Sequence, residues 1–121
     1  MKHIYLIIPH ERFDVVNEIL YKHKVGGHMF YDIKGRGKAK PEPVRERVEG
    51  YGGFATGRTY IPEFGTRTRL EVFVPDSIAE QLIQDLLTTL STGSAKDGKI
   101  FVSDLAQAYD IGTKQTGDVA L

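Results

Sequence analysis

The sequence predicts an α+β fold with the element order β-α-β-β-α-β. Two observations carry this prediction. Four short runs rich in β-branched and aromatic residues alternate with two segments in which apolar residues recur every three or four positions. The stretch 35–65 follows neither period and separates the second run from the third. A chain of 121 residues has the usual length of one domain, so residues 1–121 are expected to form a single domain.

The first strand and the first helix are expected in the N-terminal quarter of the chain. Residues 2–8 are rich in β-branched side chains, and their run I-Y-L-I-I is apolar on both alternating faces, as in a central strand. From Glu11 the apolar residues follow helical spacing, and Gly26 and Gly27 are expected to end that helix. A second strand is expected over residues 28–34.

The second half of the chain repeats this order. Residues 68–74 alternate between two faces and predict the third strand. Ser77 and Glu80 match a capping box, in which the serine side chain accepts from a backbone N–H and the glutamate reaches back to the start of the helix. The helix is expected to run to about Thr92, and a fourth strand is expected over residues 100–104.

With right-handed crossovers this order gives the ferredoxin-like split βαβ arrangement, a βαββαβ sandwich in which two helices cover one face of the sheet. The other face also needs a cover. Tyr5, Ile7, Phe30 and Phe73 are expected to lie on it, and no predicted element remains to cover them. We therefore expect this face to be buried between subunits.

Composition excludes several classes of protein. Lysine plus arginine and aspartate plus glutamate both number 16, so the formal net charge is zero, which argues against a nucleic-acid-binding surface over the whole molecule but leaves room for a local basic patch. The chain has no cysteine, which excludes disulfides, thiol catalysis and zinc–thiolate sites. No apolar run approaches the roughly 20 residues of a membrane span, and the N-terminus lacks a signal-peptide pattern, so a cytoplasmic protein is expected.

The stretch 35–65 is expected to be a functional loop between the second and third strands. Long loops in small domains are either functional or linkers, and this one is rich in lysine, arginine, tyrosine and glycine. A disordered insertion without a role is the alternative. Loop tyrosines serve as contact anchors or modification targets, or they only pack within the loop. The candidate partner-binding residues are Arg45, Arg47, Tyr51, Arg58 and Tyr60.

Two glycine-rich basic turns are expected at the same end of the sheet. Glycine lets backbone amides approach an anion closely, and lysine or arginine supplies the compensating charge. Together the turns predict a phosphate cradle, although each alone also occurs in ordinary turns. The candidate residues are Gly35, Arg36, Gly37 and Lys38 in the first turn and Lys96, Asp97, Gly98 and Lys99 in the second.

No catalytic or metal site emerges from the sequence. The four histidines are scattered, and no predicted helix carries a histidine pair with a carboxylate at metal-ligand spacing. This also counts against a metal-tolerance trimer of similar fold. There is no nucleophile-elbow or Walker motif. The protein is therefore expected to be no enzyme and to require no cofactor.

Several motifs, taken together, resemble the PII nitrogen-regulatory signal-transduction proteins over nearly the whole chain. M-K-x-I-x-x-I-I opens the sequence, V-G-G-H-M leads to Y-D-I-K-G-R-G-K, and E-V-F-V-P-D precedes the second helix. The most specific motif is T-G-S-A-K-D-G-K-I-F-V-S-D, which is similar to the family's signature T-G-x-x-G-D-G-K-I-F-V. On these motifs the chain is identified as a divergent PII-like member.

The resemblance implies a homotrimer of ferredoxin-like subunits that binds adenine nucleotides in clefts between subunits. Residues 35–65 would form the T-loop, which docks on targets such as ammonium transporters or metabolic enzymes. Residues 92–99 would form the B-loop, and residues 105–121 the C-terminal segment. The two basic turns would lie near the phosphates. The residues implied near the adenine are Gly27, Met29, Glu71 and Phe73.

The chain departs from the family pattern around the implied nucleotide. Lys38 and Ala39 stand where the family has arginine and glutamine, and the glutamine helps hold magnesium and 2-oxoglutarate. Asp110 and Gly112 stand where two arginines reach the phosphates from a neighbouring subunit. A carboxylate near a triphosphate repels it, whereas Lys96, in place of a glycine, restores positive charge. ADP or AMP is therefore expected to bind at least as well as ATP.

Together these observations predict a PII-like regulator of nitrogen metabolism that binds ADP, AMP or ATP and controls partner proteins through its T-loop. Two alternatives stay open. The first is a PII-like sensor of carbon or energy status that binds ADP or AMP with bicarbonate and does not respond to 2-oxoglutarate. The second, less favoured, is a small ferredoxin-like enzyme.

Overall fold

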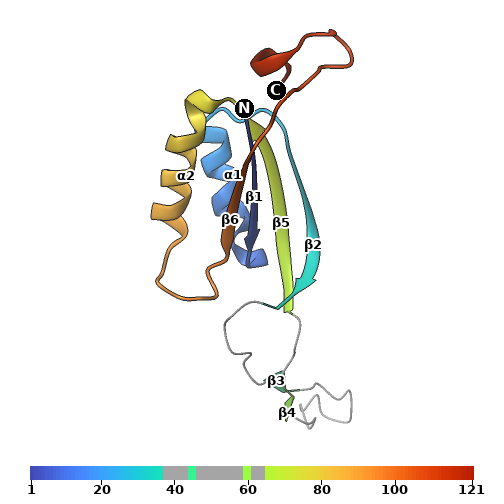
Figure 1. Ribbon diagram of the computed structural model, residues 1–121. Coiled ribbons are helices and arrows are strands. Elements are labelled where there is room, and N and C mark those ends of the chain that lie inside the picture. Colours follow the sequence, from blue (N-terminus) through green and yellow to red (C-terminus); the bar gives the residue numbers. More distant parts are fainter. Residues whose placement is uncertain (37–43, 46–58, 61–64) are drawn as a thin grey trace.

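The computed structural model describes residues 1–36, 44–45, 59–60 and 65–121, which form a four-stranded sheet with two helices on one face (Figure 1). The strand order is β2-β5-β1-β6, and every neighbouring pair is antiparallel. This is the predicted α+β ferredoxin-like sandwich. The elements of the sandwich are β1 (Lys2–Ile8), α1 (Phe13–Lys22), β2 (His28–Gly35), β5 (Gly65–Val74), α2 (Asp76–Leu90) and β6 (Lys99–Asp104).

The core lies between the sheet and the two helices. Alternation with a period of two points every second residue of β1 and β5 toward the helices. On this face the side chains from Ile4 to Ile8 and from Thr68 to Val74 are fully buried. The helices contribute aliphatic residues at three- and four-residue spacing. The main core side chains are Ile4, Leu6, Ile8, Val16, Leu20, Leu70, Val72, Val74, Leu82 and Leu86.

The opposite face of the sheet, which we call the open face, has no cover among the described elements (Figure 1). Tyr5, Ile7 and Phe73 lie on it, as predicted, because they alternate with buried core residues. The prediction for Phe30 is wrong. Phe30 pairs with Leu70 in the ladder and packs against Phe13 at 4.4 Å between ring centroids, so it lies on the helix-covered side.

Both ends of the first helix differ from the prediction. A short 3-10 turn, η1 (His10–Arg12), precedes α1 where the helix was expected to begin. The helix ends at Lys22, and Gly26 and Gly27 do not end it. Instead Lys24 takes the left-handed conformation, with φ of 57°, and Val25 N–H donates to the carbonyl of Leu20. A lysine therefore closes the helix where a glycine is more usual.

The predicted capping box of the second helix is also wrong. Pro75 occupies the N-cap with ψ of 151°, so the helix begins at Asp76 and Ser77 lies inside its first turn. No side chain caps this helix, and Glu80 accepts a hydrogen bond from Gln84 instead. The helix ends at Leu90, slightly before the expected end near Thr92.

The sheet has two distinct ends. We call the end where β1 and β2 finish and β5 and β6 begin the loop end, and the opposite end the tail end. Gly35 pairs with Gly65 as the last pair of the β2–β5 ladder at the loop end, so the expected long loop starts and finishes there. Within that stretch the structure describes a two-residue pairing of β3 (Val44–Arg45) with β4 (Thr59–Tyr60).

The C-terminal segment lies beyond the tail end of the sheet (Figure 1). Leu105 N–H donates to the carbonyl of Met1, which ties the segment to the start of β1. The chain then makes a closed turn in which Tyr109 bridges Thr116, and it finishes with η2 (Gly117–Ala120). The sequence showed no period here, and the turn is held by local hydrogen bonds rather than by core packing.

Candidate functional site

The loop between α2 and β6, residues 91–98, belongs to the loop end of the sheet. Thr92 and Asp97 close it: Thr92 N–H and Thr92 Oγ1 each donate to a different oxygen of the Asp97 carboxylate at 2.6 Å. Ser94 Oγ accepts from Lys96 N–H at 3.1 Å. The two hydrogen bonds from Thr92, the side-chain one first, hold the pKa of the Asp97 carboxyl below its usual value.

Gly98 fixes this loop against the central strand. Its φ is +115°, a conformation that favours glycine. A Cβ on Gly98 would lie 2.1 Å from the carbonyl oxygen of Ile7, so only glycine lets the loop approach β1 this closely. The neighbouring Lys99 starts β6 opposite Ile7 and is exposed. A lysine ammonium therefore stands beside a tightly held turn.

A hollow of about 480 Å³ lies beside this loop, between the end of α2 and the start of β6. Its apolar walls include Ile8, Leu86 and Ile100, and the loop contributes Asp97 and Gly98. At Gly35, the other glycine at the loop end, a Cβ would meet no atom of the described residues within 4 Å. Gly35 and Arg36 of the first predicted basic turn thus lie at the same end of the sheet as the second turn, with β5 and β1 between them.

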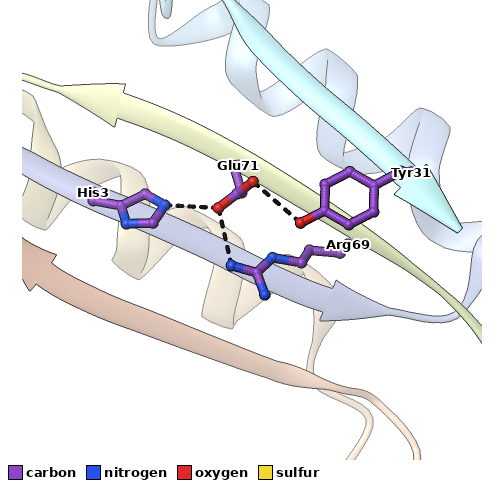
Figure 2. Close-up of polar contacts among 4 residues, drawn as sticks. All are labelled: His3, Tyr31, Arg69 and Glu71. Atoms are coloured by element: carbon purple, nitrogen blue, oxygen red, sulfur yellow. Dashed lines mark hydrogen bonds and ion pairs between the residues drawn. The ribbon is translucent and has the colours of Figure 1, made fainter. Parts of the chain in front are cut away.

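Glu71 is the centre of a polar network on the open face (Figure 2). Its Oε1 lies 3.0 Å from His3 Nε2 and accepts from an Arg69 guanidinium N–H at 3.0 Å. Its Oε2 accepts from the hydroxyl of Tyr31 at 3.4 Å. Burial tends to raise the pKa of Glu71, but the hydrogen bonds from Arg69 and His3 outweigh it, and the pKa lies below its usual value.

Aromatic rings surround this network. The His3 ring stacks on Phe73, with centroids 4.8 Å apart, and the Arg69 guanidinium lies 4.0 Å from the centre of the Tyr5 ring. Arg69 Nε is buried and has no hydrogen-bond partner within the part of the chain that the structure describes. Met29 pairs with Glu71 in the ladder and is exposed beside it. The open face thus presents aromatic, aliphatic and charged groups together.

The candidate nucleotide residues fall into two groups that one chain does not bring together. Gly27, Met29, Glu71 and Phe73 lie in the half of the sheet toward the tail end, where β2 begins and β5 finishes. Gly35, Arg36 and the residues Lys96, Asp97, Gly98 and Lys99 lie at the loop end. The six residue steps from Met29 to Gly35 alone amount to about 20 Å along the strand.

Several candidates lie outside the described residues. They are Gly37 and Lys38 of the first basic turn and Arg47, Tyr51 and Arg58 of the long loop. Arg45 and Tyr60 are described only as backbone, in β3 and β4. The partner-binding loop therefore stays a prediction.

Sequence reasoning missed His3, Arg69 and Tyr31 as partners of Glu71, and Thr92 as the partner of Asp97. Alternation along β5 puts Arg69 and Glu71 on one face of the strand, which is the signal that the sequence offers for this pair. Which residues of β1 and β2 stand opposite depends on register, which alternation within one strand does not specify.

Asp110 belongs to the C-terminal segment, which lies at the tail end of the sheet and away from the loop end of the same chain. Its carboxylate accepts from Thr113 N–H at 2.8 Å, which holds the pKa of Asp110 below its usual value and closes the C-terminal turn. Leu121, the last residue of the C-terminal segment, lies near Gly26, so this segment packs at the tail end of the sheet. Asp110 reaches a ligand at the loop end only if that ligand belongs to another copy of the chain.

Among the described residues no group of three histidine, cysteine or acidic side chains could hold a metal ion. None of the helices in the described part of the chain is long and apolar enough to cross a membrane.

Comparison with known proteins identifies the family. The family model described as "Nitrogen regulatory protein P-II" matches residues 1–115. Over 121 residues, covering both chains completely, the sequence is 31% identical to nitrogen regulatory protein P-II 1 of Escherichia coli K12 and 30% identical to nitrogen regulatory protein P-II of Rhodobacter capsulatus. A solved B. subtilis GlnK–ATP complex superposes with a TM-score of 0.72 at 25% identity, covering 99% of this chain and 96% of that one. The chain belongs to the nitrogen regulatory protein P-II family.

Proposed function

We propose that this chain is a regulatory protein that binds an adenine nucleotide between two copies of itself and is not an enzyme. Family membership supports regulation, since the family and its curated relatives are named nitrogen regulatory proteins. The GlnK–ATP complex supports an adenine nucleotide as the ligand. The nucleotide would set the conformation of the stretch 35–65, which would contact a partner protein of nitrogen metabolism. The proposed location is the cytoplasm.

The observation that carries the proposal is the separation of the candidate residues between two ends of one sheet. A nucleotide touches both groups only if the tail end of one copy meets the loop end of another. Such a head-to-tail contact is heterologous, and it closes into a ring when the rotation allows. It therefore supports a cyclic assembly such as the proposed homotrimer, in which each copy gives its loop end to one site and its tail end to the next.

The loop end has the chemistry that phosphates require. Lys99 supplies an exposed ammonium group, and Lys96 and Arg36 add positive charge in the neighbouring turns. No atom of the described residues lies within 4 Å of where a Cβ on Gly35 would be, which favours close approach of a phosphate to the backbone there. Ammonium and guanidinium groups with accessible backbone amides are the usual partners of phosphate oxygens.

The tail end has the chemistry that a base and a ribose require. Met29 and Phe73 offer apolar and aromatic surface for a flat heterocycle. The Glu71 carboxylate accepts hydrogen bonds, so it suits a sugar hydroxyl or an exocyclic amine. His3 and Arg69 hold Glu71 in place on the open face.

The second candidate function is a sensor of carbon or energy status, and Asp110 favours it. Asp110 and Gly112 bring no positive charge to the phosphates from the tail, and the Asp110 carboxylate is already held in its own turn. A site with fewer cations discriminates less for a triphosphate. ADP or AMP, with bicarbonate, would then be the effectors. Titration with bicarbonate and with 2-oxoglutarate plus magnesium separates the two functions, since only the nitrogen sensor responds to 2-oxoglutarate.

Calorimetric titration with ATP, ADP and AMP tests the proposed function. At least one of the three should bind the wild-type protein, and Lys99→Ala should weaken that binding about tenfold or more, because it removes a charged hydrogen-bond donor. Lys22→Ala, which removes an exposed lysine from α1, serves as the matched control and should leave affinity unchanged. Absence of binding by all three nucleotides would refute the proposal.

A further inference from the structure

The carboxylate of Asp97 is directed into its own loop. Both of its oxygens are taken by one residue, since Thr92 N–H donates to Oδ2 and Thr92 Oγ1 donates to Oδ1, each at 2.6 Å. The two residues stand five positions apart, so their contact closes residues 92–97 into a ring. Charged acceptors make stronger hydrogen bonds than neutral ones, and Thr92 donates two such bonds to the Asp97 carboxylate.

The same loop is fixed at two further points. Within the ring, Asp97 N–H donates to the carbonyl of Ser94 at 3.2 Å, and Ser94 Oγ accepts from Lys96 N–H. On the other side Gly98 is pressed against the carbonyl of Ile7, where no side chain fits. Lys99 follows at once as the first residue of β6. The direction of the Lys99 side chain therefore depends on the contact between Thr92 and Asp97 that closes residues 92–97.

A direct contact between Asp97 and a nucleotide fits these observations poorly. A carboxylate beside a phosphate costs electrostatic energy, and the cost rises as water is excluded. In the structure the negative charge of Asp97 is compensated by two donors of Thr92 within the loop. The sequence assigned Asp97 to the nucleotide contacts because it lies in a turn rich in lysine and glycine. That pattern does not distinguish a residue that contacts the nucleotide from one that only holds the loop in shape.

We propose that Asp97 is a positioning residue that touches no nucleotide and that, together with Thr92, holds the loop in the shape that aims Lys99 at the ligand. This inference rests on the proposed function of the same site. The Thr92–Asp97 contact, which we call the brace, holds the loop through hydrogen bonds of the chain itself. A loop that is ordered by its own contacts loses less conformational entropy when a ligand arrives.

A substitution by asparagine distinguishes a residue that holds the loop in shape from one that holds a divalent cation. The substitution Asp97→Asn would keep the brace, since the new amide oxygen can accept from Thr92 N–H and the new NH₂ group can donate to Thr92 Oγ1, but it would remove the charge. A residue that holds a divalent cation beside the phosphates needs the charge, and a brace does not. Asp97→Asn and Asp97→Ala therefore give different results for the two roles.

The experiment measures affinity for the tightest-binding of ATP, ADP and AMP, and hydrogen exchange of the loop amides without ligand. Asp97→Ala should weaken binding about tenfold or more, and Thr92→Val about three- to tenfold, while Asp97→Asn and Thr92→Ser should stay within about threefold of the wild type. In the ligand-free protein, exchange in residues 91–98 should speed up in Asp97→Ala and Thr92→Val only. Asp85→Ala, which removes a hydrogen-bonded carboxylate from α2, is the matched control and should leave affinity and loop exchange unchanged.

A double-mutant cycle completes the test. If the two side chains act as one brace, Asp97→Ala with Thr92→Val should bind no more weakly than Asp97→Ala alone. The inference is overturned if Asp97→Asn binds as weakly as Asp97→Ala, or if exchange in the ligand-free loop is the same in Asp97→Ala and in the wild type. In either case a wild type that binds nucleotide leaves the proposed function standing. A wild type that binds none removes both.

Discussion

His3 Nε2 lies 3.0 Å from Oε1 of Glu71, across the boundary between two neighbouring strands. The same oxygen accepts from Arg69, so one half-buried carboxylate holds a histidine and a guanidinium on the open face (Figure 2). Glu71 thereby fixes the polar part of a surface that is otherwise aromatic and aliphatic.

Glu71→Ala should lower the free energy of unfolding by about 1–3 kcal/mol, because it leaves Arg69 without its carboxylate and loses hydrogen bonds to a charged acceptor. Denaturant unfolding measures the change. Glu80→Ala is the control, since Glu80 is an exposed residue of α2 with one hydrogen bond to Gln84, and its effect should stay below about 0.5 kcal/mol. Equal effects of the two substitutions would contradict the role given to Glu71.

Gly98→Ala should destabilise the protein more than Gly93→Ala. Both glycines have positive φ, which costs an L-residue about 1–2 kcal/mol. At Gly93 a Cβ would meet no atom within 4 Å in the part of the chain that the structure describes, whereas at Gly98 it would lie 2.1 Å from the carbonyl oxygen of Ile7. Thermal unfolding of the two variants gives the comparison. A melting temperature of Gly98→Ala at or above that of Gly93→Ala would show that the loop does not need this approach to β1.

Asp85 should make stability depend on pH in acid. His23 and then Lys22 hold the pKa of the Asp85 carboxyl below its usual value through hydrogen bonds of 2.8 and 3.1 Å. A depressed pKa means that the stabilisation is present above the unfolded-state pKa, about 3.9, and is lost as pH falls through the folded-state pKa. Asp85→Asn should therefore be less stable than the wild type at pH 6, and the gap should close below about pH 4. A gap of the same size at pH 3 would contradict this assignment.

Phe101→Asp should weaken self-association if the open face is covered by other copies. The Phe101 ring stacks on Tyr5, with centroids 4.7 Å apart, and 42% of Phe101 is exposed in a single chain. A charge there would be desolvated in an assembly. Tyr21→Asp on the outer side of α1 is the matched control, an exposed aromatic residue off the sheet. Light scattering should report a smaller molecular mass for Phe101→Asp than for Tyr21→Asp. Equal masses for the two variants would mean that Phe101 does not lie in the interface.

Much of the fold follows from the sequence because period and composition are local signals. The faces of β1 and β5 could be predicted from alternation. Gly35 and Arg36, the described part of the first basic turn, lie at the same end of the sheet as the second turn. Phe30 could not be placed, because its face depends on the pairing of His28 with Val72 rather than on its own strand. Ser77 matched a capping motif, yet the N-cap is Pro75, two residues too early for the motif to form.

The candidate site was less accessible to sequence reasoning than the fold. The family resemblance supplied Met29 and the basic-turn pattern supplied Lys99. Neither gave the separation of these residues along the sheet, which depends on the pairing of the strands. The roles of Thr92 and Asp97 rest on a contact within one loop, and contacts of that kind follow from backbone conformation that no periodicity reports.

The claim that one site is shared between two copies has a direct test in mixed assemblies. Lys99→Ala removes the loop-end charge, and Met29→Glu places a carboxylate at the tail end. Each variant alone should bind nucleotide weakly. When the two are refolded together in equal amounts, a loop end from Met29→Glu can meet a tail end from Lys99→Ala, so about a quarter of the sites should bind as tightly as in the wild type, since random pairing gives each combination equal chance. A calorimetric titration of the mixture that shows no tight sites would mean that the site lies within one chain, and the account of a shared site would be wrong.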